Sequence, residues 1–382
     1  MKTVAISKAN DYKYENVRAA IEDSIDHLGG LSKYIKKGQR VLLKLNLLMK
    51  KRPEEAVTTH PVFVKALGDI LVEYGCEVIL GDSPAGPYTI RQLEGVYRAC
   101  GIEEIAIEGG FILNKDVEVV ERDFPDGMAI KKINLIKIVE DVDVVISVSK
   151  LKTHGMAVFT GAVKNMFGVI PGLQKIDYHF KMPDVYQFCN MLVDVCSYVK
   201  PTLSFMDGII GMEGEGPSAG DPRKVGLVLA SESPYHLDAI AAKIIGLAAS
   251  KVPTIKNSIE RGLIKENLED CLVKGLSLEE CNVKEFNVPS MNSIHFIKGR
   301  VPAFLEKILM NALQPKPLFL HQDCIGCKDC QVSCPPDAII MKDNKPYVDL
   351  KKCIRCFCCQ ELCPKKAVAI KRRKLINRIL RM

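Results

Sequence analysis

A cysteine-rich stretch occurs twice near the C-terminal end of the chain. The first copy reads Cys324-Ile-Gly-Cys327-Lys-Asp-Cys330-Gln-Val-Ser-Cys334-Pro335, and the second reads Cys353-Ile-Arg-Cys356-Phe-Cys358-Cys359-Gln-Glu-Leu-Cys363-Pro364. Both copies have the spacing C-x2-C-x2-C-x3-C-P, and Cys353 follows Cys324 by 29 positions. Thiolates at this spacing ligate the irons of [4Fe–4S] clusters. One copy alone could be a zinc site or a chance match, but two copies in tandem predict two [4Fe–4S] clusters.

The repeated run resembles that of the bacterial two-cluster ferredoxins. In those proteins the fourth cysteine of each run ligates the cluster of the other run. The resemblance therefore implies two ligand sets, one of Cys324, Cys327, Cys330 and Cys363, and one of Cys353, Cys356, Cys359 and Cys334. Cys358 is a ninth cysteine that the pattern leaves unused. We expect a small, partly buried thiol there, with ligand exchange or redox sensing as the alternative.

The composition sets the class of protein. The chain has 382 residues, which suits two or three domains. Its 47% hydrophobic and 26% charged residues are typical of a folded globular protein. We expect no transmembrane segment, because no apolar run reaches the length of a membrane span, and the N-terminus lacks the apolar core of a secretion signal. Cysteine-ligated clusters favour a reducing compartment, so we expect a cytoplasmic protein of an anaerobe.

Positive charge gathers towards the C-terminus. The net charge is +7, and residues 301–382 carry 16 Lys and Arg against 7 Asp and Glu, or +9. Residues 371–382 alone carry +6, with leucines and isoleucines at helical spacing, which predicts a short basic amphipathic tail. The tail could make peripheral contact with a membrane surface or an acidic partner, or it could pack on the main domain. No basic stripe contains interleaved aromatic residues, so we expect no nucleic-acid partner.

Strands and helices alternate in the N-terminal two thirds of the chain. This alternation predicts an α/β fold with a mostly parallel sheet and flanking helices, followed by a small α+β ferredoxin-like domain. The predicted strands are 3–8, 40–48, 77–80, 142–148, 202–206 and 226–230, with short strands at 117–120 and 129–135, and the predicted helices are 17–31, 61–74, 89–100, 183–198 and 235–247. The expected domains are 1–300 (α/β), 301–318 (helix and linker), 319–370 (two clusters) and 371–382 (tail).

Four groups of polar residues follow predicted strands. In open parallel sheets, ligands bind outside the carboxyl ends of the strands, so we expect these groups to line one cleft. A lysine there can lose its proton or hold a carboxylate or phosphate, and a histidine can transfer protons. The candidate catalytic residues are His154, Lys164, Lys152 and Asp207. The candidate substrate- or cofactor-binding residues are Asn46, Thr59, Asp82, Ser83, Lys150, Thr160, Gly161, Asn165, Glu213 and Gly216.

Several of these segments resemble one known family. The runs Ser149-Lys150-Leu151-Lys152-Thr153-His154 and 159–168, together with 44–46, 58–61, 81–83, 207–208 and 213–217, resemble domain of unknown function family 362. The resemblance covers roughly residues 1–290. It implies the α/β architecture, and many members of that family carry the same C-terminal ferredoxin module. It implies little chemistry, because the reaction of the family is not established.

A shorter segment, 150–172, is similar to the nickel-pincer lactate racemases. In that family, the histidine matching His154 transfers protons and the lysine matching Lys164 carries the tethered nickel cofactor. His179 is off register by about one residue from a nickel-ligating histidine, and Gly161-Ala162-Val163 stands where that family has Gly-Gly before the lysine. The similarity therefore implies His154 and Lys164 as site residues and does not extend to nickel.

Three functions agree with these observations. The first is an iron–sulfur oxidoreductase, in which the two clusters relay electrons between a donor or acceptor protein and a small-molecule site in the α/β domain, with or without a further cofactor. The second is a ferredoxin-like electron carrier with a non-catalytic binding domain. The third is a racemase-like isomerase or lyase with accessory clusters. The first is our hypothesis, because fusing an electron donor to its acceptor in one chain fixes a short transfer path.

Overall fold

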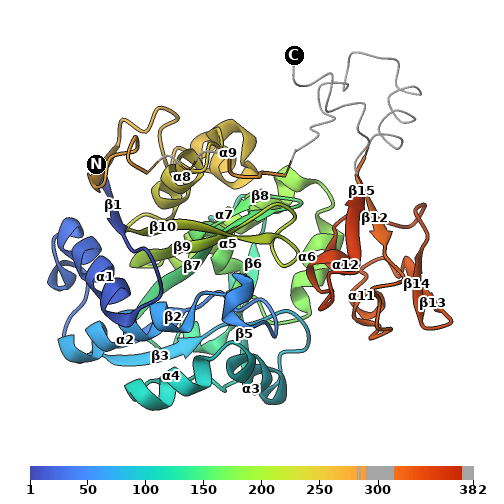
Figure 1. Ribbon diagram of the computed structural model, residues 1–382, viewed down its shortest axis with the longest axis horizontal. Helices are drawn as coiled ribbons and strands as arrows, with labels where there is room; N and C mark the ends of the chain where they lie inside the picture. The colour runs from blue at the N-terminus through green and yellow to red at the C-terminus, as the bar shows by residue number, and fades with distance from the viewer. Residues whose placement is uncertain (282, 284, 290–313, 372–382) are drawn as a thin grey trace.

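The computed structural model describes residues 1–281, 283, 285–289 and 314–371. An α/β domain makes up most of the molecule, and a small C-terminal domain packs against one side of it (Figure 1). None of the described helices is long and apolar enough to cross a membrane. The helix expected before residue 314 and the basic tail at 372–382 lie outside the described residues.

The α/β domain is built on a nine-stranded mixed sheet with the order β11-β1-β10-β9-β7-β2-β3-β4, and β8 pairs with β7. The strands are β1 (Lys2–Lys8), β2 (Arg40–Lys44), β3 (Glu77–Gly81), β4 (Ile112–Leu113), β7 (Val144–His154), β8 (Val158–Thr160), β9 (Leu203–Glu213), β10 (Asp221–Ser231) and β11 (Cys271–Gly275). Five of the strand pairs are parallel, namely β1–β11, β2–β3, β2–β7, β3–β4 and β7–β9. Pairs β1–β10, β9–β10 and β7–β8 are antiparallel. The predicted fold class, mostly parallel with flanking helices, is confirmed.

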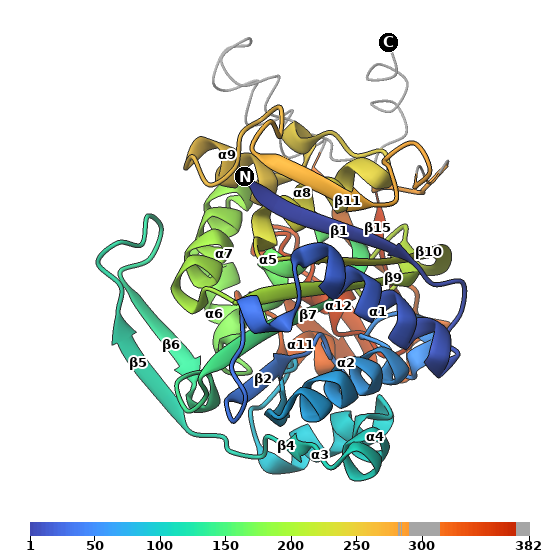
Figure 2. The same cartoon turned by 90° about the vertical axis from the view of Figure 1, so that its left-hand side faces the viewer.

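Helices cover both faces of this sheet (Figure 2). One layer consists of α1 (Tyr14–Leu28), α2 (Pro61–Tyr74), α3 (Ile90–Ala99) and α4 (Ile102–Gly109), and the other contains α5 (Ala162–Asn165), α6 (Gln174–Lys181), α7 (Val185–Val199), α8 (Pro234–Ile244) and α9 (Pro253–Glu260). Strand β2 serves both layers, because successive side chains of a strand point to opposite faces. Val41 and Leu43 pack in the core under α1 and α2, whereas Leu42 packs in the core under α7.

Most differences from the predicted elements concern where strands end. Strand β7 was expected to stop at 148, and it continues to His154, because it pairs with β8 and with β9 over these residues. All eleven of its residues are buried. Strand β9 likewise continues past 206 to Glu213. Helix α4 was not predicted, and β5 (Val119–Asp123) and β6 (Lys132–Ile136) form a separate hairpin.

The C-terminal domain contains two short hairpin-like sheets and two single-turn helices. Its elements are β12 (Lys316–Phe319), α11 (Asp329–Val332), β13 (Ile339–Lys342), β14 (Lys345–Val348), α12 (Cys358–Glu361) and β15 (Val368–Lys371). Strand β12 pairs with β15, and β13 pairs with β14. Lys316 and Pro317, in the segment expected as a linker, pair with Lys371 and Ile370. Each cysteine run thus lies next to one helical turn and one sheet.

Candidate functional site

The eight cysteines of the two runs surround two separate cavities. The first cavity, of about 370 Å³, is lined by Cys324, Cys327, Cys330 and Cys363. The second cavity, of about 330 Å³, is lined by Cys334, Cys353, Cys356 and Cys359, with Cys358 also in its wall. These are the two sets that the ferredoxin resemblance implied, including the exchange of the fourth cysteine between the runs. The donor set of four thiols around each cavity fits one [4Fe–4S] cluster.

The spacing of the thiols also fits a cluster better than a single ion. Among the described residues, no three side chains of His, Cys, Asp or Glu are grouped closely enough to hold one metal ion. The cysteines instead face a cavity from several sides, as ligands of a four-iron group do. Backbone N–H groups point at the thiols of the fourth cysteine of each run: Ala338 N lies 3.2 Å from Cys334 Sγ, and Ala367 N lies 3.2 Å from Cys363 Sγ. Such hydrogen bonds favour the thiolate form and tune the cluster.

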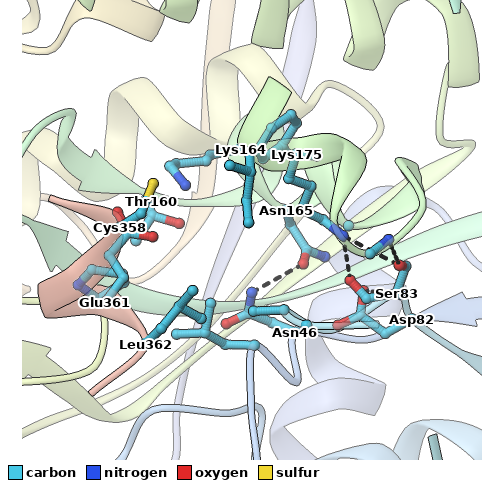
Figure 3. A pocket seen from close by; sticks show the side chains of 18 of the residues that line it. Asn46, Asp82, Ser83, Thr160, Lys164, Asn165, Lys175, Cys358, Glu361 and Leu362 are labelled. Carbon is cyan, nitrogen blue, oxygen red and sulfur yellow. Dashed lines mark hydrogen bonds between the residues drawn. The ribbon is translucent and has the colours of Figure 1, made fainter. Parts of the chain in front are cut away.

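A third cavity lies where the α/β domain meets the C-terminal domain (Figure 3). Its empty volume is about 780 Å³, which includes space open to solvent, and the centre of a water molecule can occupy about 90 Å³ of it. We call it the interdomain pocket. The predicted site residues that line it are Asn46, Asp82, Ser83, Lys152, Thr160, Lys164 and Asn165. Its other charged or thiol-bearing lining residues, which were not predicted as site residues, are Lys44, Lys175, His179, Cys358 and Glu361.

The parallel strands bring these residues together. Lys44 ends β2 and Asn46 follows it, and Asp82 and Ser83 follow β3, so both pairs lie at the carboxyl edge of the sheet. Thr160 ends β8 opposite Lys152 of β7. Gly161 then starts the single turn of α5, which carries Lys164 and Asn165. This is the edge at which open α/β sheets bind ligands.

A buried ion pair forms one side of the pocket. Lys44 Nζ lies 2.6 Å from Asp82 Oδ1, and these side chains are 0% and 3% exposed. Asp82 also accepts hydrogen bonds from Leu47 N (2.7 Å) and Ser83 N (2.8 Å), which hold the carboxylate between the ends of β2 and β3. Gly168 packs against this pair, because a Cβ at position 168 would collide with both Asp82 Oδ1 and Lys44 Nζ. The pair therefore fixes the geometry of this wall.

Two lysines of the pocket hydrogen-bond to neutral oxygens only. Lys152 Nζ donates to Val57 O (2.7 Å). Lys175 Nζ donates to Ile170 O (2.6 Å) and to the carbonyl and hydroxyl of Ser83 (2.7 and 3.2 Å). Burial, and then the charge of Lys164, lowers the pKa of Lys152 to about 7. Burial likewise lowers the pKa of Lys175 to about 7, against the opposing effect of Asp82.

Lys164 differs from these two lysines. Its side chain is partly exposed, and its ammonium group lies 5.8 Å from the centre of the Phe167 ring. Among the described residues, no hydrogen bond or ion pair involves its Nζ atom. Figure 3 shows Lys164 on the side of Thr160, Cys358 and Glu361. Lys164 is thus a cation with unused donors at the end of the pocket near α12.

His154 stands behind this end of the pocket and joins the two domains. Its Nδ1 accepts hydrogen bonds from Met156 N (3.1 Å) and Ala157 N (3.2 Å), so its proton is on Nε2. Nε2 lies 3.1 Å from Oε1 of Glu361. Burial, and then the charge of Lys164, lowers the pKa of His154. Burial alone would raise the pKa of Glu361, but His154, Lys164 and His179 together lower it to about 2. At neutral pH a neutral imidazole therefore faces a carboxylate across the domain boundary.

Further hydrogen bonds fix the C-terminal domain on the α/β domain. They are Ser218 Oγ to Glu361 O (2.7 Å), Gln360 Nε2 to Glu215 O (2.8 Å), Lys366 Nζ to Gly220 O (2.8 Å) and Lys51 Nζ to Pro364 O (3.2 Å). The segment 213–217, predicted as part of the site, thus contributes mainly to this contact. Pro217 itself lines the pocket next to α12.

Lys150 and Asp207, both predicted site residues, do not line the interdomain pocket. They form a buried network of their own, in which Lys150 Nζ lies 2.8 Å from Asp207 Oδ2. Tyr12 completes it, because its hydroxyl accepts from Lys150 (2.7 Å) and donates to Asp207 Oδ1 (2.8 Å). His60 stacks on the Tyr12 ring, and its backbone N–H donates to Asp207. This network ties β7 and β9 to the N-terminal segment.

Four other predicted residues also have structural contacts. Thr59 donates to Val148 O (2.9 Å), and Glu213 accepts from Asn287 N (2.9 Å). Gly161 packs against Asp238, whose carboxylate accepts from two backbone N–H groups of α5. A Cβ at Gly216 would collide with Thr153 O. These positions support the pocket from behind rather than line it.

Sequence reasoning missed Lys175, Cys358 and Glu361 as pocket residues. Lys175 follows no predicted strand, and it reaches the pocket because Pro171 and Gly172 turn the chain into α6. Cys358 and Glu361 belong to α12 of the C-terminal domain, so they reach the pocket through domain packing alone. The one indication in the sequence was Cys358, the cysteine of the second run that belongs to neither ligand set. In the structure this cysteine is buried.

Comparison with known proteins places the chain in a family. Residues 41–243 match the family described as a domain of unknown function, DUF362, and the chain belongs to that family. Residues 316–364 match a 4Fe-4S dicluster domain, so the protein carries two [4Fe–4S] clusters. A thylakoid-associated protein of Synechocystis sp. is 34% identical over 268 residues, which cover 69% of this chain and 80% of that protein.

Two solved structures are similar at lower identity. The lactate racemase apoprotein from Thermoanaerobacterium thermosaccharolyticum is 12% identical with a TM-score of 0.41, and the match covers 64% of this chain and 57% of that one. A protein from Thermotoga maritima is 12% identical with a TM-score of 0.35, over 62% of this chain and 60% of that one. This chain thus spans about three fifths of those solved chains. The likeness concerns the fold alone, and we take no residue role from it.

Proposed function

We propose that this protein is an iron–sulfur oxidoreductase. Its substrate binds in the interdomain pocket, and the two clusters carry electrons between that substrate and an external redox protein. One observation carries the proposal: the pocket of the α/β domain is closed by the second cluster-binding loop. Cys358, Glu361 and Leu362 line the pocket, and they stand between Cys356 and Cys363 in the sequence. A molecule in the pocket therefore touches the segment that carries the cluster ligands.

The two ligand sets differ in exposure, which gives the proposed relay a direction. Cys327, of the first set, is exposed, and its neighbours Ile325 and Lys328 are exposed as well. Each set has one buried cysteine, Cys330 in the first and Cys359 in the second, whereas no cysteine of the second set is exposed, and Cys358 beside the pocket is buried. Bound clusters supply one-electron transfer. The first set therefore faces a donor or acceptor protein, and the second faces the substrate.

The residues of the α/β domain bind and enclose the substrate in this proposal. Leu48, Phe167, Ile176 and Leu362 supply apolar wall, and the lysines and Ser83 supply donors. A mostly apolar cleft with a few polar groups is typical of small-molecule sites. The electron-carrier alternative needs no such cleft facing the cluster loop. The isomerase alternative predicts that the substrate is converted without any reductant, and this can be measured directly.

The test is an anaerobic reoxidation experiment with the whole protein. The clusters are reduced chemically, excess reductant is removed, and the low-mass fraction of an extract of the source cells is added while cluster absorbance is followed. We expect reoxidation by this fraction in the wild type and in Lys181→Met, an exposed lysine of α6 outside the pocket. We expect slow or no reoxidation in Lys164→Met with its iron content unchanged. Equal rates in all three proteins would contradict a substrate site in this pocket.

A further inference from the structure

The interdomain pocket has an excess of positive charge among its described lining residues. Four lysines line it, namely Lys44, Lys152, Lys164 and Lys175, against the two carboxylates of Asp82 and Glu361. Asp82 pairs with Lys44, whereas Glu361 lies against the neutral imidazole of His154. The described lining thus has two more lysines than carboxylates, and Lys152, Lys164 and Lys175 form no ion pair with a described residue. Buried charges in proteins are normally paired, so this excess points to an anionic ligand.

The three lysines differ in how many of their ammonium protons have a hydrogen-bond acceptor. Lys175 Nζ has three oxygen acceptors within 3.2 Å, which use all three of its protons. Lys152 has one acceptor, Val57 O, and Lys164 has none among the described residues. The unused donors thus belong to Lys152 and Lys164. Lys175 is a fixed part of the wall.

Lys152 and Lys164 lie at the same end of the pocket. Lys152 of β7 faces Thr160 of β8 in the strand register, and Thr160 precedes Lys164 by one tight turn at Gly161. The hydroxyl of Thr160 makes no hydrogen bond to any described residue, although the residue is only 5% exposed. The charge of Lys164 is, after burial itself, the main cause of the lowered pKa of Lys152. Two lysines and one hydroxyl with unused hydrogen-bonding capacity therefore lie at the end of the pocket that also contains the carboxylate of Glu361.

The size of the pocket suits a small ligand. Its volume of about 780 Å³, part of it open to solvent, has room for a small organic acid or a small phosphate compound. A lysine ammonium binds carboxylate and phosphate alike as a point charge. The chemistry that both share is an oxyanion.

We infer that the interdomain pocket binds the oxyanion of a small carboxylate or phosphate compound between Lys164, Lys152 and Thr160, next to Cys358 of the cluster loop. The role of this ligand as substrate rests on the proposed function, whereas its binding does not. The oxyanion offsets the positive charge of the pocket, and it accepts hydrogen bonds from the ammonium group of Lys164 and from the hydroxyl group of Thr160. The remainder of the ligand then extends towards Asn46, whose Oδ1 is a buried acceptor without a hydrogen bond.

Calorimetric titration of the whole, cluster-loaded protein tests this inference without any electron transfer. The probes are inorganic phosphate, sulfate, acetate and succinate, with chloride at equal ionic strength as the reference. We expect one saturable site per chain, and the probe that binds most tightly separates a phosphate site from a carboxylate site. We expect Lys164→Met to weaken that binding at least tenfold, Lys164→Arg to keep part of it, and Lys181→Met to leave it unchanged.

Protection from chemical modification supplies a second readout in the wild-type chain. Lys164 is acylated with a small reagent, and its modification is measured by mass spectrometry with and without the best probe. We expect protection of Lys164 and none of Lys181. Binding that survives Lys164→Met, no saturable binding of any probe at millimolar concentrations, or a Lys164 that stays equally reactive would each overturn the inference. Reoxidation without oxyanion binding would keep the proposed function and discard the oxyanion site.

Discussion

Nε2 of His154, on the last residue of β7, lies 3.1 Å from Oε1 of Glu361, on the last residue of α12. The two side chains are 1% and 11% exposed, so this contact is inside the boundary between the domains. It joins the segment behind the pocket to the segment that carries the cluster ligands. The placement of the cluster loop as a wall of the pocket depends on it.

Removal of the imidazole should loosen this boundary. In His154→Ala the buried carboxylate of Glu361 loses its contact with the imidazole, and losing the partner of a buried charged group costs about 1–3 kcal/mol. We expect Cys358, now 4% exposed, to be alkylated roughly tenfold faster in the iron-loaded protein, because the domains open more often. The rate is measured by mass spectrometry of the alkylated peptide.

His236 is the matched control for this experiment. It is 2% exposed and lies 3.2 Å from Asp270, within the α/β domain. We expect His236→Ala to lower thermal stability while Cys358 stays protected. Equal acceleration in both variants would mean that general destabilisation, and not the domain boundary, controls access to Cys358.

The pocket should bind oxyanions less well as the pH rises. Below about 7 the ammonium of Lys152 is charged, and above that value it is mostly neutral, because burial and the charge of Lys164 lower its pKa to about 7. A bound anion favours the charged form, so binding above this pH takes up a proton. We expect sulfate affinity to fall by up to about tenfold per pH unit between roughly pH 7 and pH 9, since one pKa unit is 1.36 kcal/mol.

Sulfate is the suitable probe, because its charge stays constant over this range. The measurement is calorimetry in buffers of different ionisation enthalpy, which counts the protons taken up. Lys152→Met should bind more weakly, with a flatter pH profile. An affinity that is constant or that rises with pH in the wild type would rule out Lys152 as a titrating ligand group.

The Lys44–Asp82 pair should matter far more for stability than a surface pair of the same length. Lys44→Met leaves Asp82 buried without its cation, which costs about 3–5 kcal/mol. Arg18 Nη2 also lies 2.6 Å from its partner, Glu73, but these side chains are 25% and 58% exposed. We expect Arg18→Met to cost less than about 1 kcal/mol. Urea unfolding of the anaerobic proteins, followed by circular dichroism, measures both, and equal losses would contradict the buried pair.

Cys358 should be dispensable for cluster binding. It lies in the wall of the second cavity, but the four cysteines of that ligand set are complete without it. We expect Cys358→Ala to retain about eight irons per chain, two clusters of four, whereas Cys356→Ala loses a large part of one cluster. Metal analysis after anaerobic purification measures this. An equal loss of iron in both variants would make Cys358 a ligand.

The cluster domain was predictable from the sequence because its chemistry is local. Ligand spacing and the repeat fix which cysteines face which cavity, and the structure groups them in the same way. The carboxyl edge of the sheet was predictable for a related reason. Asn46 and Asp82 follow strands whose parallel pairing brings their ends together.

The rest of the site depends on contacts that leave no local pattern. Lys150 and Asp207 have the residue types of a catalytic pair, but both side chains hydrogen-bond to Tyr12 in a buried network away from the pocket. The run after residue 148 was expected as a loop, yet β8 and β9 keep it as strand, so its lysines are held inside the fold. Glu361 reaches the pocket from the C-terminal domain. The hydrophobic periodicity of a single helix or strand does not predict how two domains pack against each other.

The most direct test is whether a ligand bound in the interdomain pocket changes the magnetic resonance spectrum of a cluster. The electron paramagnetic resonance spectrum of the chemically reduced protein is recorded with and without the oxyanion that binds most tightly, in the wild type, Lys164→Met and Lys181→Met. We predict that the oxyanion changes the spectrum in the wild type and in Lys181→Met, and leaves Lys164→Met unchanged. A wild-type spectrum that stays the same when calorimetry shows the site to be saturated would contradict a pocket that adjoins the second cluster.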